Sequence, residues 1–105
     1  MTTTQQNEHQ RNLREQDRKL KEHKREMYRA LIAEQVMYCL GEPKDLIQVQ
    51  VRRLWEDRYR ANVFVGAGIT SATIVNSYFL VTDSNGKIID ATPTIKKQYS
   101  RELAL

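Results

Sequence analysis

The spacing of apolar residues predicts one long helix at the start of the chain. Between residues 27 and 40, apolar side chains recur every three or four positions, as in a helix that lies on a core. They are Met27, Tyr28, Leu31, Ile32, Val36, Cys39 and Leu40. Gly41 can adopt the left-handed conformation that closes a helix, and Pro43 cannot continue one. We therefore expect a helix from about Glu8 to Leu40 whose C-terminal half packs on a core.

After Pro43 the pattern changes to the alternation of half-buried strands. The first strand is expected to point Ile47, Val49, Val51 and Trp55 toward the core. After a turn at residues 56–58, the return strand points Tyr59, Ala61, Val63 and Val65 to the same side. The two strands therefore form a hairpin with one apolar and one polar face.

Two more strands are expected after the glycines at 66 and 68, which break the second strand. A third strand spans about 72–82, and the turn at Asn85-Gly86 leads to a fourth strand at 87–91. Both faces of the third strand are apolar, with Ile74, Tyr78 and Leu80 on one side and Val75, Phe79 and Val81 on the other. We expect this strand to be central, with a cover over its second face.

Together these elements predict an α+β fold, in which one long N-terminal helix packs by its C-terminal half on a four-stranded antiparallel β-meander. In outline this order of elements resembles the cystatin-like and NTF2-like folds, and a resemblance at this level implies an architecture but no function. We divide the chain into a basic, polar helical arm at 1–25, a single α+β domain at 26–95 and a C-terminal tail at 96–105. The tail residues Tyr99, Leu103 and Leu105 are expected to pack back or to bind a neighbour.

The arm is expected to project, because the predicted helix would be about 50 Å long and a compact domain of this size has a radius of gyration of about 12 Å. Leu13, Leu20 and Met27 are spaced by seven, as in a coiled coil, but the positions between them include Asp17 and Lys24. Three alternatives stay open: a paired coiled coil, an arm docked on a partner, and a solvated helix stabilised by ion pairs. The residues that would bind a partner are Leu13, Leu20, Arg14, Arg18, Lys21 and Arg25.

Composition narrows the function classes. The chain has 105 residues, enough for one core, and a net charge of +4. No apolar run is long enough to cross a membrane and no secretory signal is present, so we expect a cytoplasmic protein without membrane contact. The single cysteine, Cys39, excludes an intramolecular disulfide, and we expect it to be a buried thiol.

No set of residues in the sequence indicates catalysis, a cofactor or a metal. His9 and His23 are fourteen residues apart on the predicted helix, about 21 Å, so one chain cannot bring them to a single ion. The glycines at 66 and 68 lack the lysine and the following helix of a phosphate-binding loop. Asp83 is typical of a residue that caps its own turn. We therefore expect a protein that is not an enzyme.

Two other groups of residues are candidates for binding. Arg52, Arg58 and Arg60 should share the outer face of the first hairpin, with Arg52 opposite Arg60. Two like charges opposite each other destabilise a sheet unless an anion or a carboxylate lies between them, so this face is a candidate anion or nucleic-acid site. A pocket between the helix and a curved sheet would be lined by Tyr28, Trp55, Tyr59 and Tyr78.

The sequence favours a non-catalytic protein–protein interaction or assembly module that forms homo-oligomers. In this hypothesis the sheet associates with a second copy, and the projecting helix engages its symmetry mate or another protein. One alternative is a nucleic-acid-binding protein that uses the basic arm and the Arg52, Arg58 and Arg60 face. The other is a small-ligand or enzymatic pocket between helix and sheet.

Overall fold

A computed structural model describes the backbone of residues 2–100 and the side chains of residues 10–100, so the expected packing of Leu103 and Leu105 and the surroundings of His9 lie outside the described residues. Helix α1 (Thr2–Leu40) is followed by strands β1 (Leu46–Trp55) and β2 (Arg58–Val65), a short 3-10 helix η1 (Ile69–Ser71), and strands β3 (Thr73–Thr82) and β4 (Ile88–Thr92). The four strands form one antiparallel sheet in the order β1-β2-β3-β4. The predicted α+β meander is therefore confirmed, although the helix begins earlier than expected.

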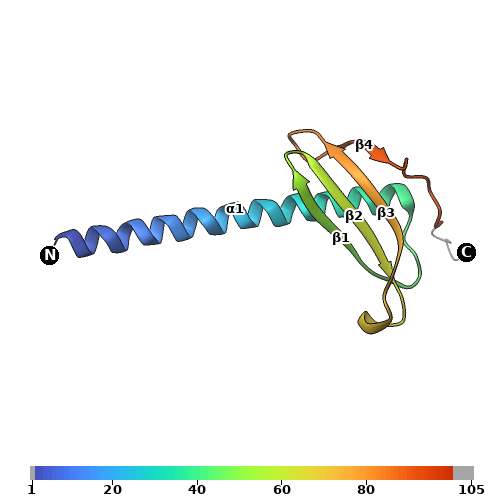
Figure 1. Ribbon diagram of the computed structural model, residues 1–105, viewed down its shortest axis with the longest axis horizontal. Coiled ribbons are helices and arrows are strands. Elements are labelled where there is room, and N and C mark those ends of the chain that lie inside the picture. Colours follow the sequence, from blue (N-terminus) through green and yellow to red (C-terminus); the bar gives the residue numbers. More distant parts are fainter. Residues whose placement is uncertain (1, 101–105) are drawn as a thin grey trace, which may run out of the picture.

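The molecule is elongated because α1 is longer than the sheet is wide. Its 39 residues correspond to about 58 Å of helix. The overall dimensions are 70 × 31 × 28 Å and the radius of gyration is 19.0 Å, against about 13 Å for a compact chain of this length. Strands β1–β3 cross the C-terminal half of α1 on one side, and the N-terminal half extends beyond them (Figure 1). No helix within residues 2–100 has an apolar stretch long enough to cross a membrane.

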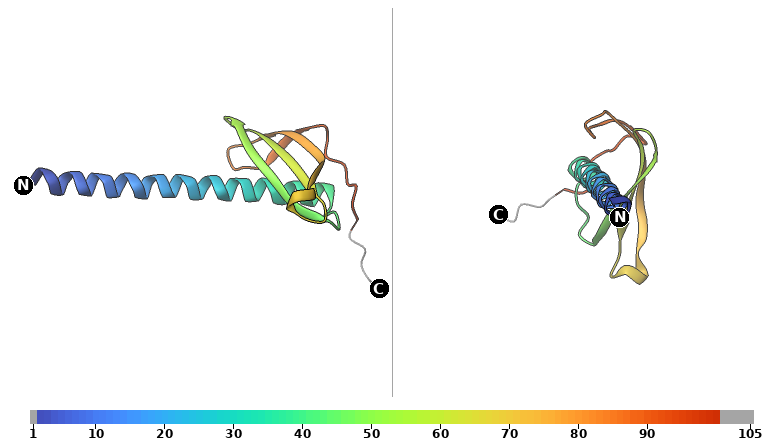
Figure 2. Two further views of the ribbon diagram at one scale, coloured as in Figure 1. Left: turned by 60° about the horizontal axis from the view of Figure 1, so that its bottom comes forward. Right: turned by 90° about the vertical axis from the view of Figure 1, so that its left-hand side faces the viewer.

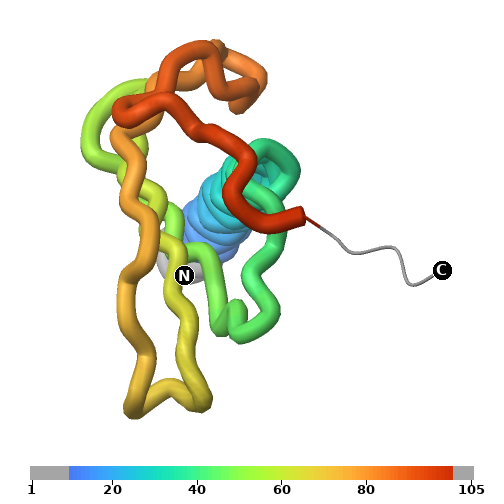
Figure 3. Tube along the Cα trace, turned by 90° about the vertical axis from the view of Figure 1, so that its right-hand side faces the viewer, coloured from blue at the N-terminus to red at the C-terminus, as the bar shows by residue number. Residues whose placement is uncertain are grey.

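Gly41 ends α1 as the sequence predicts, with a positive φ of 88° and a hydrogen bond from its N–H to the carbonyl of Met37 at 2.9 Å. The C-terminal segment then completes the cap, because the N–H groups of Gln98 and Tyr99 donate to the carbonyl of Leu40 at 2.8 and 3.1 Å. A Cβ atom at position 41 would overlap the Tyr99 carbonyl. Figure 3 shows this segment, in red, crossing the end of the helix. Ile95 and Tyr99 also pack against the core.

The helix contributes a narrow stripe to the core. Ile32, Val36 and Leu40, spaced by four, are completely buried against the inner face of the sheet. The expectation that Met27, Leu31 and Cys39 are core residues is wrong, because all three are exposed. Met27 and Leu31 lie roughly opposite Val36 around the helix axis and therefore point away from the sheet.

Two hydrogen-bonding side chains fasten α1 to the β3–β4 hairpin. Tyr28 Oη donates to the carbonyl of Ser84 at 2.9 Å. Gln35 Nε2 donates to the carbonyl of Gly86 at 2.8 Å, and Gln35 Oε1 accepts the N–H of Ile88 at 2.9 Å. Side chains of the helix therefore hydrogen-bond to the backbone of the hairpin at the edge of the core.

Register shifts in the sheet turn two predicted inner residues outward. In the β1–β2 ladder Arg53 faces Tyr59 and Trp55 faces Arg58, so the irregularity between Arg53 and Trp55 puts Trp55 on the outer face, not the inner one. In the β2–β3 ladder Val63 faces Asn76 and Phe64 faces Ile74. This second shift moves Ile74 away from Tyr78 and Leu80, which stay buried.

The outer face of the sheet is open. In both views of Figure 2, α1 lies against one face and no other described segment lies over the opposite face. Phe79 and Val81 are half-buried by their neighbours on that face, and Val75, at the second register shift, is exposed. The cover that the apolar pattern of β3 predicts is therefore not supplied by residues 2–100.

Candidate interaction surfaces

The side of α1 that faces away from the sheet carries a row of exposed apolar residues. Successive residues of a helix are rotated by about 100° around its axis. On this basis the side chains of the row point in directions that span about 40° around the axis, roughly opposite to the core residue Val36. Each is between 40% and 87% exposed. We call this row the back stripe; it consists of Leu13, Leu20, Met27, Leu31 and Tyr38. The stripe runs from the projecting arm onto the part of α1 that carries the sheet.

Two hollows border the back stripe where α1 approaches the β3–β4 hairpin. One, of about 430 Å³, is lined by Met27, Leu31 and Asn85 together with neighbouring helix residues. The other, of about 460 Å³, has walls that include Leu31, Tyr38 and Ile95. Exposed apolar residues beside such hollows are typical of surfaces that bind another chain.

The predicted partner-binding residues of the arm fall on two different sides of α1. Leu13 and Leu20 belong to the back stripe. By the same helical geometry, the predicted basic residues point toward the side on which the sheet lies, within an arc of about 80° that Arg11 and Arg29 also share. We call these six the basic ridge; they are Arg11, Arg14, Arg18, Lys21, Arg25 and Arg29.

The basic ridge is unfavourable for an isolated helix. Its members succeed one another at three- or four-residue spacing, and each such like-charge pair costs about 0.2–0.5 kcal/mol. Among residues 10–100 the only ion pair on α1 joins Lys21 Nζ to Asp17 Oδ2 at 3.3 Å, and both side chains are exposed. A row of glutamates at 15, 22 and 26 lies along one flank of the ridge. The positive charge is therefore only partly offset.

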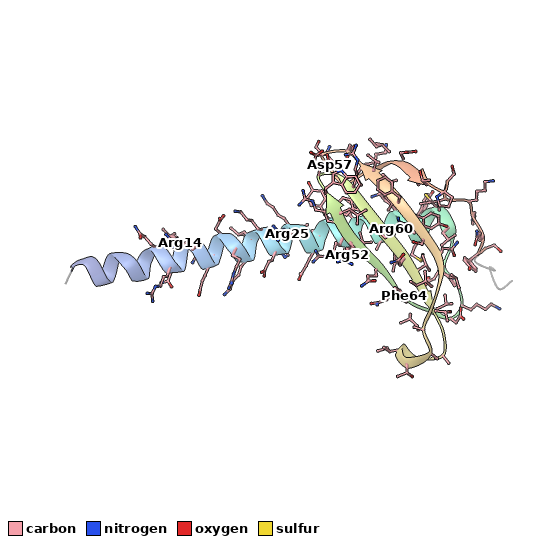
Figure 4. The ribbon with its side chains drawn as sticks, in the orientation of Figure 1. Arg14, Arg25, Arg52, Asp57, Arg60 and Phe64 are labelled. Carbon is pink, nitrogen blue, oxygen red and sulfur yellow. The ribbon has the colours of Figure 1, made fainter. Side chains whose placement is uncertain are left out.

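The three arginines of the outer sheet face lie as the sequence predicts. Arg52 and Arg60 are direct partners in the β1–β2 ladder, and Arg58 follows on the same face of β2. Arg58 forms an ion pair of 3.6 Å with Glu56, and Arg60 Nη1 donates to Ser77 Oγ at 3.3 Å. No carboxylate of residues 10–100 lies within ion-pair distance of Arg52 or Arg60. Figure 4 shows both arginines on the sheet, in the orientation that also shows Arg14 and Arg25 on the arm.

Trp55 lies beside these arginines because of the register shift in β1. It is 52% exposed, its ring centroid is 5.8 Å from that of Phe79, and the guanidinium carbon of Arg58 lies 5.7 Å from the ring centre. No residue type in β1 signals this shift, and strict alternation places Trp55 with the core residues.

The four residues expected to line one pocket are not brought together. Trp55 is on the outer face, whereas Tyr59 and Tyr78 are buried core residues. Burial raises the pKa of the Tyr78 phenol, a hydrogen bond from Asn76 Nδ2 lowers it in part, and the nearby Tyr99 raises it. Of these four residues, Tyr28 and Tyr59 line one hollow together.

That hollow, of about 300 Å³, lies in the corner between α1 and the two hairpin turns. Its charged lining is mixed: Lys24, Arg25, Arg29 and Arg53 provide four positive charges, and Glu56, Asp57 and Asp83 provide three negative ones. The Asp83 carboxylate is already engaged, because Oδ1 accepts the N–H groups of Asn85 and Lys87 at 2.9 Å each, which confirms the predicted turn cap. A corner with nearly balanced charge has no strong preference for an anion or a cation.

No metal-binding cluster is assembled in the part of the chain that the structure describes. There, no three metal-ligating side chains lie close enough to share an ion. His23 is exposed on the arm, and Cys39 is exposed on α1.

Sequence reasoning found the leucines of the arm and the three outer arginines, but it missed Leu31 and Tyr38 as surface residues and Arg11 and Arg29 as members of the ridge. A helical projection of residues 10–40 would have separated the back stripe from the basic ridge. It could not have shown which of the two faces the sheet. Comparisons with protein-family models, curated proteins and solved structures found no match to this chain.

Proposed function

We propose that this chain is a protein–protein assembly module that pairs with a second copy of itself through the back stripe. The observation that carries the proposal is that four of the five stripe residues are placed symmetrically about a point between Arg25 and Glu26, while Met27 would face Lys24. When the helix is reversed about this point, Leu13 meets Tyr38 of the second copy and Leu20 meets its Leu31. A surface that matches itself after a half turn is what a two-fold dimer requires.

The reversed arrangement also fits the hollows and the charges. Two helices paired over residues 13–38 would be in contact along about 39 Å. The arm of one copy would bring Leu20 to the hollows beside Leu31 of the other. A parallel pair in register would instead place Lys24 and Glu34 against their own copies, and like charges in contact are unfavourable. We therefore propose the antiparallel pair.

Pairing through the sheet is the weaker interpretation for a homodimer. The outer face carries Arg52, Arg58 and Arg60, so two such faces in contact would bring six guanidinium groups together. The back stripe carries five apolar side chains, interrupted by Gln16, Lys24 and Glu34. Burial of apolar area drives association, so self-association is better supported by the helix than by the sheet.

The direct test is size-exclusion chromatography with light scattering on the full chain at tens of micromolar. We expect a dimer for the natural sequence and a monomer for Leu20→Asp, which puts a charge into the stripe. Arg18→Asp is the matched control, because it places the same residue in the same turn on the opposite side of the helix, and it should remain dimeric. A monomeric natural protein, or equal behaviour of the two variants, would contradict the proposal.

The orientation can be tested with engineered cysteines in a Cys39→Ser background. Leu13→Cys combined with Tyr38→Cys should give a covalent dimer under mild oxidation, because the antiparallel pair brings these positions together. Leu13→Cys alone should not, because the two copies of residue 13 would be about 37 Å apart along the helix axis. Efficient cross-linking of the single variant would show a parallel pair.

A further inference from the structure

We propose that the face of the molecule opposite the back stripe binds single-stranded nucleic acid. Two positively charged surfaces point to this side. By helical geometry the basic ridge points to the side of α1 on which the sheet lies, and the outer face of the sheet, with Arg52, Arg58 and Arg60, points away from α1 on the same side. Figure 4 labels Arg14 and Arg25 of the ridge and Arg52 and Arg60 of the sheet. We call the two together the basic face. Because the back stripe points away from it, this inference does not depend on self-association.

The first argument is that most charges of the basic face lack an ion-pair partner among residues 10–100. The ridge has one exposed ion pair, Lys21 with Asp17, and the outer face has one, Arg58 with Glu56. Arg52 and Arg60 are opposite each other across the ladder, where like charges destabilise a sheet. An anion that bridges the two guanidinium groups would remove this repulsion, and phosphate fits their planar, two-pronged geometry.

The second argument is that an exposed aromatic ring lies among the arginines. Trp55 is half-exposed next to Phe79 and Arg58, on the strand that carries Arg52. Neighbouring strands are about 4.8 Å apart and alternate residues on one strand about 6.7 Å apart. A base stacked on Trp55 would therefore keep its phosphate within reach of the Arg52 and Arg60 side chains. Aromatic platforms surrounded by positive charge are the usual means of binding unpaired bases.

The combination favours a single strand over other polyanions. The bases of a duplex are already stacked on one another, so they are not free to cover Trp55. An acidic peptide would neutralise the arginines but has no base to stack on the ring. The arm supplies a track of charge that leads away from the sheet, which suits a flexible chain of phosphates longer than one site.

Trp55 makes the test direct, because it is the only tryptophan in the chain. The full-length protein would be titrated at low salt with fluorescein-labelled oligouridine of about 12 nucleotides, long enough for one site. We expect quenching of tryptophan fluorescence and a rise in fluorescein anisotropy at the same concentrations. The logarithm of the affinity should fall with the logarithm of the salt concentration, with a slope of about −0.7 for each phosphate contacted.

Variants distinguish the contribution of base stacking to the affinity from the contribution of positive charge. Trp55→Leu should weaken binding, measured by anisotropy, by about 5- to 100-fold, the range for loss of one stacked base. Arg52→Gln should weaken binding by a smaller factor and reduce the salt slope by about one phosphate, while the urea midpoint of unfolding stays equal or rises because a like-charge pair is removed. Lys19→Gln is the matched control, since residue 19 lies off the ridge, and it should bind as the natural protein does.

Three outcomes would overturn the inference. The first is no change in either signal up to about 100 µM protein, which is weaker than ordinary non-specific binding. The second is equal binding by the natural protein and Trp55→Leu. The third is binding of duplex RNA or polyglutamate as tight as that of oligouridine, with the same quenching.

Oligothymidine at the same length distinguishes DNA from RNA, and Leu20→Asp should retain binding per chain whether or not it dimerises.

Discussion

Gln35 and Gly86 are joined across the helix–sheet boundary, with the side-chain Nε2 of Gln35 donating to the Gly86 carbonyl at 2.8 Å. The Oε1 atom of the same side chain accepts the N–H of Ile88 at 2.9 Å. The Gln35 amide therefore both donates to and accepts from the backbone of the hairpin, as a neighbouring strand would. This contact fixes how α1 is rotated about its own axis. It therefore keeps the back stripe away from the sheet and the basic ridge on the side of the sheet.

Gln35→Ala should destabilise the fold by about 2 kcal/mol, because it removes the two hydrogen bonds to the hairpin and leaves the Ile88 N–H without a partner at the edge of the core. Urea unfolding followed by circular dichroism measures the change. Gln50→Ala, on the exposed face of β1, is the control and should change stability by less than about 0.5 kcal/mol. Equal effects of the two substitutions would show that the amide contact contributes nothing specific.

Gly86→Ala should be more damaging than an ordinary loop substitution, by about 2 kcal/mol or more. Gly86 has a φ of 81°, and a Cβ atom there would lie 2.7 Å from a ring carbon of Tyr28. Gly68→Ala serves as the comparison, because its backbone is extended and no atom lies within 4 Å of the added carbon. Thermal unfolding of both variants checks the difference; a Gly86→Ala protein as stable as Gly68→Ala would refute the close approach of helix and hairpin.

Glu56→Asn should stabilise the protein by about 0.5–1 kcal/mol. Glu56 has a positive φ of 44° in the turn between β1 and β2, a conformation that asparagine tolerates better than glutamate. The ion pair with Arg58 that the change removes is exposed and contributes little. Asp57→Asn removes the same charge from the neighbouring position without relieving the backbone. If both variants show the same shift in urea midpoint, charge and not backbone conformation is responsible.

Stability should fall at alkaline pH partly because of Tyr78. Burial raises the pKa of its phenol in the folded state, so the unfolded chain loses this proton first, near pH 10. The contribution of Tyr78 is therefore complete below about pH 10 and is lost as the pH rises from there through the folded pKa. Urea unfolding at a series of pH values should show a steeper alkaline loss for the natural protein than for Tyr78→Phe. Tyr38→Phe, at a position 87% exposed, should leave the slope unchanged.

The positions of the main elements could be predicted from the sequence because they depend on local chemistry. Gly41 ends the helix through a left-handed conformation, and Asp83 to Gly86 form the predicted turn. Arg52 and Arg60 lie opposite each other as predicted, although this pairing depends on the irregularity between Arg53 and Trp55. The irregularities could not be predicted. Trp55 and Ile74 each depend on one extra residue in a strand, and no residue type in β1 or β3 marks its place.

By itself, the sequence determined that there is a long helix with apolar and basic positions, a four-stranded meander, and three arginines on one face of a hairpin. Only the tertiary structure decided which of the apolar helix residues are core and which are surface. Ile32 and Val36 are buried and Leu31 is not, although all three fit a helical period. The physical reason is that periodicity gives the relative directions of side chains around a helix, whereas burial depends on where the one sheet, held by Gln35 and Gly86, lies against it.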